Sequence, residues 1–233
     1  MLFLHVRFPV FLLACLLLLC GRSHSEPRFQ LQLGPGVAIP CGQLLSKDFD
    51  SGGYALLGQD YAMAARFFIL PSLGVECAGS IALFPFDAGQ YAQDKKEHSD
   101  PALESLSIAA GFYLVNTVSA GLVYRYPLND RWSLTASLLA GWIGAETAPQ
   151  NIRAVYFMIG EYDSQVTSSF DESAIWQTEA GISRKIFKHW GLSLTTGFNR
   201  ADMKFKFQTK TEPYTKNLTL SWLNASLGVD FLL

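Results

Sequence analysis

The alternation of apolar and polar residues over positions 106–142 constrains the fold of this chain more than any other feature. Apolar side chains recur at every second position on both sides of the tetrapeptide Pro-Leu-Asn-Asp at 127–130. A period of two, interrupted by a short turn sequence, is typical of two antiparallel strands joined by a tight turn. We therefore expect an antiparallel hairpin here and an all-β fold.

The face opposite the apolar one carries mainly Ser, Thr and Gly. A soluble sandwich would have charged residues on that face, whereas small polar residues suit a crowded interior. Tyr124, Tyr126 and Trp132 lie beside the turn, and Trp142 lies one strand length away. These are the positions of the two aromatic girdles in a transmembrane β-barrel. The hairpin thus predicts a barrel whose apolar face points towards lipid.

The N-terminal residues have the pattern of a cleaved signal peptide. His5 and Arg7 form a short basic region, residues 8–19 an apolar run, and residues 23–25 the small-x-small pattern of a cleavage site. The run of about 12 residues is too short for a membrane-spanning helix, which needs ~20. We expect a signal peptide over 1–25, followed by a single barrel domain over residues 26–233.

Two of the four cysteines lie in this leader and leave a lipidated N-terminus open as an alternative. Cys15 follows a lipobox-like Leu-Leu-Ala but lies inside the apolar run, and Cys20 follows Leu where a small residue is needed. The mature chain keeps Cys41 and Cys77, which the predicted strands place far apart. A disulfide is therefore not expected.

The charge and hydropathy of the mature chain exclude several classes of protein. Removal of the leader takes away Arg7 and Arg22 and leaves 16 basic against 20 acidic residues, a formal charge of about −4, which argues against a nucleic-acid partner. After the leader no run of ~18 apolar residues occurs, although hydrophobic residues make up 49% of the sequence. A barrel explains why the chain is rich in hydrophobic residues and yet has no long apolar run. In barrel strands each lipid-facing apolar residue is followed by an inward-facing one that is often polar.

The same alternation, followed along the chain, predicts eight strands. They cover residues 29–39, 60–69, 73–83, 106–126, 132–142, 174–186, 192–207 and a last strand ending with 223–233. The connections alternate between long loops and short turns, with the turns at 70–72, 127–131 and 187–191. Bacterial outer-membrane barrels have this asymmetry, with short periplasmic turns and long extracellular loops.

Four local features carry more specific expectations. The strand at 106–126 exceeds the ~9 to 11 residues needed to cross a membrane, so it should protrude on the loop side; the alternative is a split near Asn116-Thr117. Residues 87–101 read as a polar loop. Within the longest loop, 147–172, residues 154–159 could form a short strand or hairpin above the membrane. The apolar phase moves between Phe198 and Met203, which predicts a bulge near residues 199–201.

Together, the leader, the strand count, the loop asymmetry and the closing alternation to Phe231 and Leu233 resemble the small eight-stranded outer-membrane barrels. These are represented by OmpX, the OmpA transmembrane domain and the barrel proteins of Bacteroidetes-like bacteria. The resemblance implies an up-and-down antiparallel transmembrane barrel in the outer membrane of a Gram-negative bacterium, porin-like in architecture and monomeric. It also implies contact with membrane lipid and lipopolysaccharide, and recognition of the last strand by the barrel-assembly machinery. That signal usually ends in an aromatic residue, whereas Leu233 is last here.

Charged side chains on the inward face of the predicted strands define a lumen network. Arg66 and Glu76 stand equally far from the turn centred on Pro71, so they should be cross-strand neighbours. An eight-stranded barrel has room inside only for side chains, and we expect these groups to plug it; a polar conduit or proton-coupled site is the alternative. The network comprises Asp60, Arg66, Glu76, Arg125, Glu179, Lys185 and Asp230.

Aromatic residues near the strand ends are expected to anchor the barrel at the two membrane surfaces. They are Tyr124, Tyr126, Trp132, Trp142, Trp176, Trp190 and Trp222. Any binding is expected in the loop at 147–172, because the function of such scaffolds resides mainly in their loops.

The residues suited to catalysis are few and scattered. After the leader only His98 and His189 remain, far apart in the predicted topology, and no metal-ligand spacing, phosphate loop or Ser-His-Asp arrangement is present. We therefore predict no catalytic residue, no cofactor and no metal.

The sequence favours a non-enzymatic integral outer-membrane protein with a filled lumen. Its role would be envelope structure or surface interaction through the extracellular loops. One alternative is a narrow channel or transporter for small apolar molecules. Another is a soluble lipocalin-like barrel, whose apolar face would point inward around a ligand.

Overall fold

The computed structural model describes residues 28–99, 101–157, 160–207 and 214–233. The predicted signal peptide, with Cys15 and Cys20, lies outside the described residues. Cys41 and Cys77 are both free thiols.

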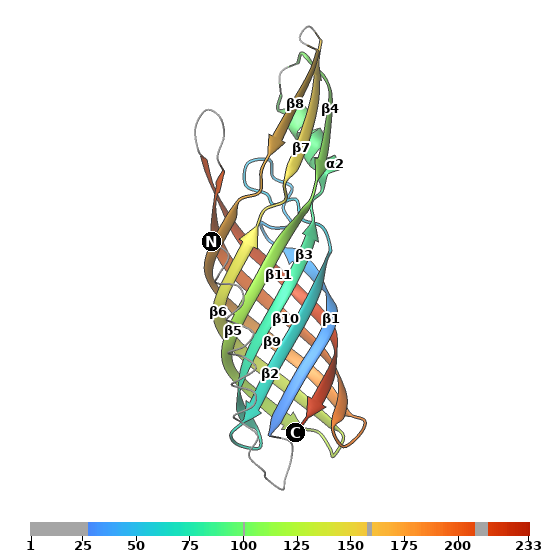
Figure 1. Cartoon of the computed structure of the whole chain (residues 1–233), viewed down its shortest axis with the longest axis vertical. Helices are drawn as coiled ribbons and strands as arrows, with labels where there is room; N and C mark the ends of the chain where they lie inside the picture. Colours follow the sequence, from blue (N-terminus) through green and yellow to red (C-terminus); the bar gives the residue numbers. More distant parts are fainter. Residues whose placement is uncertain (1–27, 100, 158–159, 208–213) are drawn as a thin grey trace, which may run out of the picture.

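Eight antiparallel strands close into a barrel (Figure 1), as the sequence predicts. Around the barrel each strand is hydrogen-bonded to the next in the order β1-β2-β3-β5-β6-β9-β10-β11 and back to β1. The strands are β1 (Phe29–Cys41), β2 (Gly58–Phe68), β3 (Leu73–Pro85), β5 (Phe112–Pro127), β6 (Trp132–Glu146), β9 (Phe170–Lys185), β10 (Trp190–Phe207) and β11 (Tyr214–Leu232).

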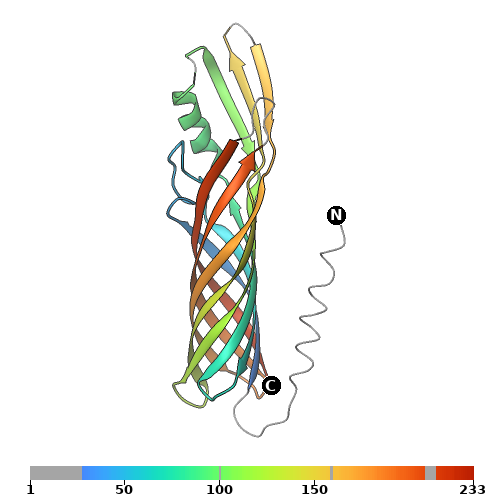
Figure 2. The same cartoon turned by 90° about the vertical axis from the view of Figure 1, so that its left-hand side faces the viewer.

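The three short turns lie at one end of the barrel and the long connections at the other (Figure 2). Strands β1 and β11 close the barrel along their length, and Gln30 pairs with Leu232 at the short-turn end. This end corresponds to the predicted periplasmic side. We refer to it below as the short-turn end and to the opposite end as the long-loop end.

A second, three-stranded sheet projects beyond the barrel at the long-loop end (Figures 1 and 2). It has the order β4-β7-β8, made of β4 (Leu103–Ala110), β7 (Gln150–Tyr156) and β8 (Gly160–Val166). The expected protrusion on the loop side and the expected hairpin in the longest loop are both present. The hairpin is longer than predicted, because it begins at Gln150.

The single strand predicted over 106–126 is wrong in detail, because it is divided between the two sheets. The break falls at Gly111 rather than at the alternative position near Asn116-Thr117. The Gly111 N–H donates to the Pro149 carbonyl at 2.9 Å, and a Cβ added at Gly111 would come within 3.1 Å of the Pro149 ring. The close approach of these two chain segments therefore sets the point at which the strand changes sheet.

The segment predicted as a polar loop at 87–101 contains a helix, α2 (Ala88–Glu97). Asp87 caps its N-terminus by accepting a hydrogen bond from the Gln90 N–H at 3.1 Å. None of its residues is fully buried, so the helix lacks the apolar stripe by which sequence periodicity reveals an amphipathic helix.

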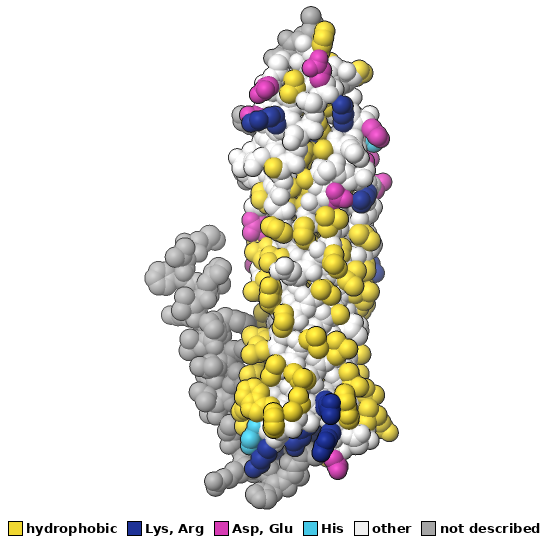
Figure 3. All heavy atoms as spheres, turned by 90° about the vertical axis from the view of Figure 1, so that its right-hand side faces the viewer, with side chains coloured by type: hydrophobic (Ala, Val, Ile, Leu, Met, Phe, Trp, Pro, Cys, Tyr) yellow, Lys and Arg dark blue, Asp and Glu magenta, His cyan; other side chains and the backbone are white. Residues whose placement is uncertain are grey.

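The outer wall of the barrel is apolar over most of its height. Outward-facing residues from five different strands are more than half exposed to the surroundings: Leu33, Leu122, Leu138, Leu194 and Leu227. Figure 3 shows that hydrophobic side chains cover a broad band of this face of the barrel below its projecting end. Such a belt is favourable when lipid surrounds it, so the chain is a transmembrane barrel of the outer-membrane type. No helix among the described segments is long and apolar enough to cross a membrane.

Strand β10 shows where the belt ends. Leu192 and Leu194 face outward and are about half exposed, whereas Met203 and Phe205 face inward and are 1% exposed. The pairing of β10 with both neighbours is continuous through this region, so the predicted bulge near 199–201 is wrong. The apolar residues change from the outer to the inner face of β10 because the interior of the barrel is polar beside Leu194 and apolar beside Met203.

Candidate functional site

The centre of the predicted lumen network is an ion pair between Arg66 of β2 and Glu76 of β3. The two residues are direct cross-strand partners, as the sequence predicts. The Arg66 Nε donates to Glu76 Oε1 at 3.0 Å, and Nη2 lies 2.9 Å from the same oxygen. The Ser137 hydroxyl of β6, on the far side of the intervening strand β5, donates to Glu76 Oε2. Both charged side chains are buried, so this group cross-links three strands through the lumen.

Two further buried carboxylates are hydrogen-bonded to side chains of other strands. Asp230 accepts a hydrogen bond from the Ser193 hydroxyl at 2.9 Å. Asp60 accepts one from the Asn224 amide at 3.3 Å. These contacts join β11 to β10 and to β2 through the lumen, and they leave the carboxylates packed among side chains rather than facing an open pore.

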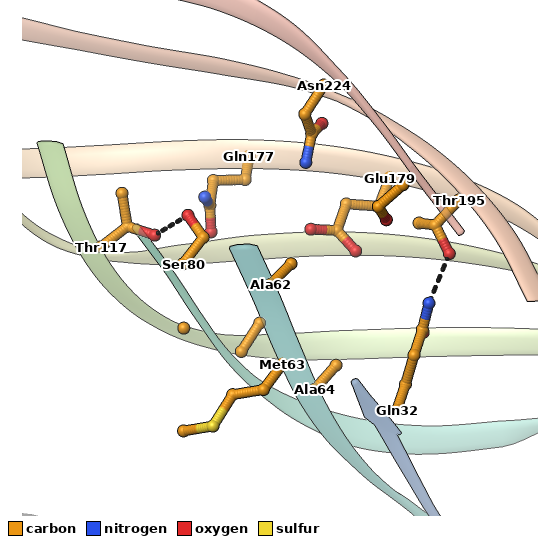
Figure 4. A pocket seen from close by; sticks show the side chains of 13 residues that line it. Gln32, Ala62, Met63, Ala64, Ser80, Thr117, Gln177, Glu179, Thr195 and Asn224 are labelled. Atoms are coloured by element: carbon orange, nitrogen blue, oxygen red, sulfur yellow. Dashed lines mark hydrogen bonds between the residues drawn. The ribbon is translucent and has the colours of Figure 1, made fainter. Parts of the chain in front are cut away.

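Glu179 lines a small cavity in the middle of the lumen (Figure 4). Gln32, Gln177, Thr195 and Asn224 lie around it, and the Gln32 amide donates to the Thr195 hydroxyl at 2.8 Å. The cavity volume is ≈ 20 Å³, which is enough for about one water molecule. The lumen at this level is therefore filled by side chains.

The two remaining members of the predicted network lie at the short-turn end. The Arg125 guanidinium donates to the Pro71 carbonyl at 3.0 Å and stacks 3.9 Å from the centroid of the Phe68 ring. Lys185 is half-buried, and its backbone N–H donates to the Arg131 carbonyl at 2.7 Å. The structure therefore divides the predicted network into a central part around Arg66 and Glu76 and a rim beside the short turns.

The upper part of the lumen contains a plug of apolar side chains that the sequence did not predict. Trp222, Phe84, Met203, Phe205 and Leu220 each have 1% or less of their surface exposed. Trp222 was expected to be an interfacial anchor, and this is wrong: its ring lies inside the barrel, edge-on to Phe84 at a centroid distance of 6.1 Å. Above the membrane the surroundings are water, so the apolar side chains of the strands turn inward.

The plug is covered by the connection between β1 and β2 and by α2. Tyr113 donates a hydrogen bond from its hydroxyl to the Gly53 carbonyl at 2.8 Å, which holds the connection against the lumen. The Tyr54 hydroxyl donates to Asp94 Oδ2 at 2.7 Å. This hydrogen bond, with a second one from Gln90, lowers the pKa of Asp94. Burial and the neighbouring Asp94 raise the pKa of Tyr54, so the cap is held by a neutral phenol and an ionised carboxylate.

The projecting sheet presents aromatic and charged side chains to the surroundings. Phe157 and Tyr162 are 73% and 58% exposed. Arg153 of β7 and Asp163 of β8 form an exposed ion pair at 3.1 Å. Strands β4 and β8 are the two edges of the sheet, and the loop predicted to carry any binding function forms most of this surface.

Six of the seven predicted anchors lie on the outer wall. Tyr124, Tyr126, Trp142, Trp176 and Trp190 are exposed, and Trp132 is partly exposed. These positions suit contact with the membrane surface, and the anchoring role itself stays a prediction.

The two histidines are separated by the length of the barrel. At the long-loop end the ring of His98 lies 2.7 Å from the Asp94 carbonyl and stacks on Phe49. His189 occupies the short turn between β9 and β10, with its ring 3.0 Å from the Leu232 carbonyl. Among the described residues no group of three or more His, Cys, Asp or Glu side chains could hold a metal ion.

The sequence matches no protein-family model and no curated protein, whereas the fold is similar to solved outer-membrane proteins. Neisserial surface protein A is 13% identical with a TM-score of 0.46, and 90% of this chain and 100% of that chain are covered. The attachment invasion locus protein Ail of Yersinia pestis is 13% identical with a TM-score of 0.47 and the same coverage. The outer membrane protein AlkL is 10% identical with a TM-score of 0.48, and 91% of this chain and 94% of that chain are covered. Each is a distant likeness in overall shape.

Proposed function

We propose that this protein is a non-enzymatic integral protein of a bacterial outer membrane, in which a sealed barrel holds the projecting sheet above the membrane for surface interaction. The proposal rests chiefly on the filled lumen. The polar network around Arg66 and Glu76 occupies its lower part, and the plug around Trp222 occupies its upper part. A barrel filled in this way serves as an anchor, and its binding surface lies in what the anchor carries.

The two alternatives, transport of small apolar molecules and soluble ligand binding, fit this arrangement less well. A channel needs a continuous opening, whereas the central cavity holds about one water molecule. A lateral exit for apolar molecules needs a gap in the wall, whereas each barrel strand is paired with both neighbours. A soluble barrel would present charged residues where Leu138 and Leu227 are exposed.

The sealed lumen is tested by recording currents through the purified barrel in planar lipid bilayers. We expect no steady single-channel conductance, because side chains fill the part of the lumen that the structure describes. A reproducible open level would contradict the proposal and favour the channel. The matched control is Trp142→Ala, which changes an outward-facing aromatic residue and should leave the current at baseline.

Surface interaction is separated from a purely structural role in the envelope by removing part of the projecting sheet. Residues 150–166 are replaced by a short Gly-Ser linker, which leaves every barrel strand in place. Cells expressing this variant should attach to epithelial cell layers less than cells expressing the full chain, with unchanged resistance to detergent. Equal attachment by both strains would contradict the surface role, and a loss of detergent resistance in the variant would favour the envelope role.

A further inference from the structure

Basic side chains dominate the short-turn end of the barrel. Exposed or half-exposed Lys and Arg residues at this end are Arg28, Arg131, Arg184, Lys185 and Lys188. In the described turns and the strand ends beside them, the exposed acidic side chain is Asp130. Figure 3 shows Lys and Arg side chains gathered below the hydrophobic belt at this end. The rim of the barrel is therefore strongly positive where the belt stops.

Arg184 marks the junction between this charge and the belt. It lies on the outer wall of β9, between its pairing partners Trp132 of β6 and Leu192 of β10. Its guanidinium carbon lies 5.2 Å from the centroid of the Trp132 ring. A guanidinium over an aromatic ring at the edge of an apolar wall can bind an anion while the ring and the chain beside it contact acyl chains.

The turns that carry the other basic residues are held in place by backbone hydrogen bonds. Ile186 donates to the Trp190 carbonyl at 2.9 Å, which closes the turn that contains Lys188. The Asn129 side chain accepts from the Arg131 N–H at 3.0 Å. The bond from Lys185 to the Arg131 carbonyl joins these two turns. The basic groups thus project from a rigid base, which limits the entropy lost when a ligand orders them.

We propose that the rim formed by Arg131, Arg184 and Lys188 binds the phosphate groups of anionic phospholipids in the periplasmic leaflet. This inference rests on the proposed function, because it requires the short-turn end to lie at that leaflet. Arg and Lys at an anionic membrane surface pair with lipid phosphates, and guanidinium groups bind phosphate through two parallel hydrogen bonds. The rim would then fix the depth of the barrel and select its lipid neighbours.

The test measures lipids retained by the purified barrel in native mass spectra, in detergent containing equal amounts of phosphatidylglycerol and phosphatidylcholine. The barrel should retain phosphatidylglycerol preferentially. Each basic residue near an anionic lipid surface contributes a factor of about five in affinity. The R131Q/R184Q/K188Q variant should therefore bind phosphatidylglycerol on the order of 100-fold more weakly.

Two control variants separate a lipid site from general charge effects. R200Q/K204Q/K206Q removes the same number of charges from the outer face of β10 near the long-loop end, and it should keep the preference. R131K/R184K retains the charge and should keep most of it. Equal loss in the β10 control, no loss in the rim variant, or full loss in the Lys variant would each overturn the proposal.

Failure of this inference is distinguishable from failure of the proposed function. Each variant is first compared boiled and unboiled on a detergent gel, which reports barrel formation without reference to lipid. A barrel that shifts on boiling but shows no lipid preference overturns the lipid site alone. A full chain whose mobility does not change on boiling would overturn the membrane barrel, and the lipid site with it.

Discussion

Leu194 and Met203 lie on the same strand, β10, but on opposite faces: Leu194 is 51% exposed on the outer wall and Met203 is 1% exposed inside the barrel. The strand continues between them without a register shift. The environment of the strand therefore changes along its length. Around Leu194 the outer face meets lipid and the inner face is polar. Around Met203 the relation is reversed, as in a water-soluble barrel.

This reversal predicts that a substitution on the outer face of β10 changes the stability of the barrel by an amount that depends on its position. A charge should be costly inside the lipid belt, and an apolar residue should be tolerated above it. Leu194→Lys places an ammonium group in the lipid belt and should lower the free energy of unfolding by up to about 4 kcal/mol. Lys204→Leu changes an exposed position above the belt and should stay within about 0.5 kcal/mol. Urea unfolding from lipid vesicles, followed by tryptophan fluorescence, measures both. Equal costs at the two positions would show that lipid does not surround Leu194.

The Arg66–Glu76 pair predicts strong coupling between two substitutions. Arg66→Met leaves Glu76 buried without its cation and should cost about 3–5 kcal/mol, as should Glu76→Leu, which leaves Arg66 without its anion. The double variant R66M/E76L removes both charges and should cost less than either single variant. A double-mutant cycle in the same unfolding assay measures the coupling. Additive costs would mean that the two side chains do not depend on each other inside the barrel.

The buried ring of Trp222 predicts a cavity effect that distinguishes a plug residue from an anchor. Trp222→Ala should cost about 3–5 kcal/mol, because it empties a space in the apolar plug. Trp142 is 72% exposed, and Trp142→Ala serves as the matched control with a smaller cost. The melting temperatures of both variants in detergent check this order. A larger loss for Trp142→Ala would contradict the inward position of Trp222.

The hydrogen bond between Tyr54 and Asp94 predicts a pH-dependent contribution of the cap. The pKa of Asp94 is lowered from 3.8 by its hydrogen bonds to Tyr54 and Gln90, so folding favours the ionised form. This stabilisation is complete above the unfolded pKa and is lost as the pH falls through the lowered folded value. Asp94→Asn should therefore lower Tm at pH 7 and have no effect near pH 2. A difference in Tm that persists at pH 2 would show that charge is not the cause.

Sequence periodicity was sufficient to predict the barrel, because membrane strands expose one face and bury the other with a strict period of two. It predicts the eight strands, the short-turn end and the partnership of Arg66 with Glu76. The pairing of these two residues follows from their equal distance to the turn at Pro71. The polar members of the lumen network were identifiable for the same reason, since they alternate with apolar residues.

The same period does not reveal which solvent surrounds a face. Trp222 and Met203 both belong to alternating patterns. They point inward because they lie above the lipid belt, and the position of that boundary cannot be read from the pattern. From the sequence alone, the change at β10 therefore predicts a bulge, and Trp222 resembles an anchor. Helix α2 was missed because its residues are mostly polar, and the break at Gly111 depends on the distant Pro149.

The most direct test of the apolar-out barrel is to express the full chain with its leader in a Gram-negative host and separate the membranes. Boiled and unboiled samples of each fraction are then compared by gel mobility in detergent. We expect the protein in the outer-membrane fraction, with a mobility that changes on boiling as the barrel unfolds. A soluble periplasmic protein with unchanged mobility would contradict the assignment of the exposed face around Leu194 to lipid.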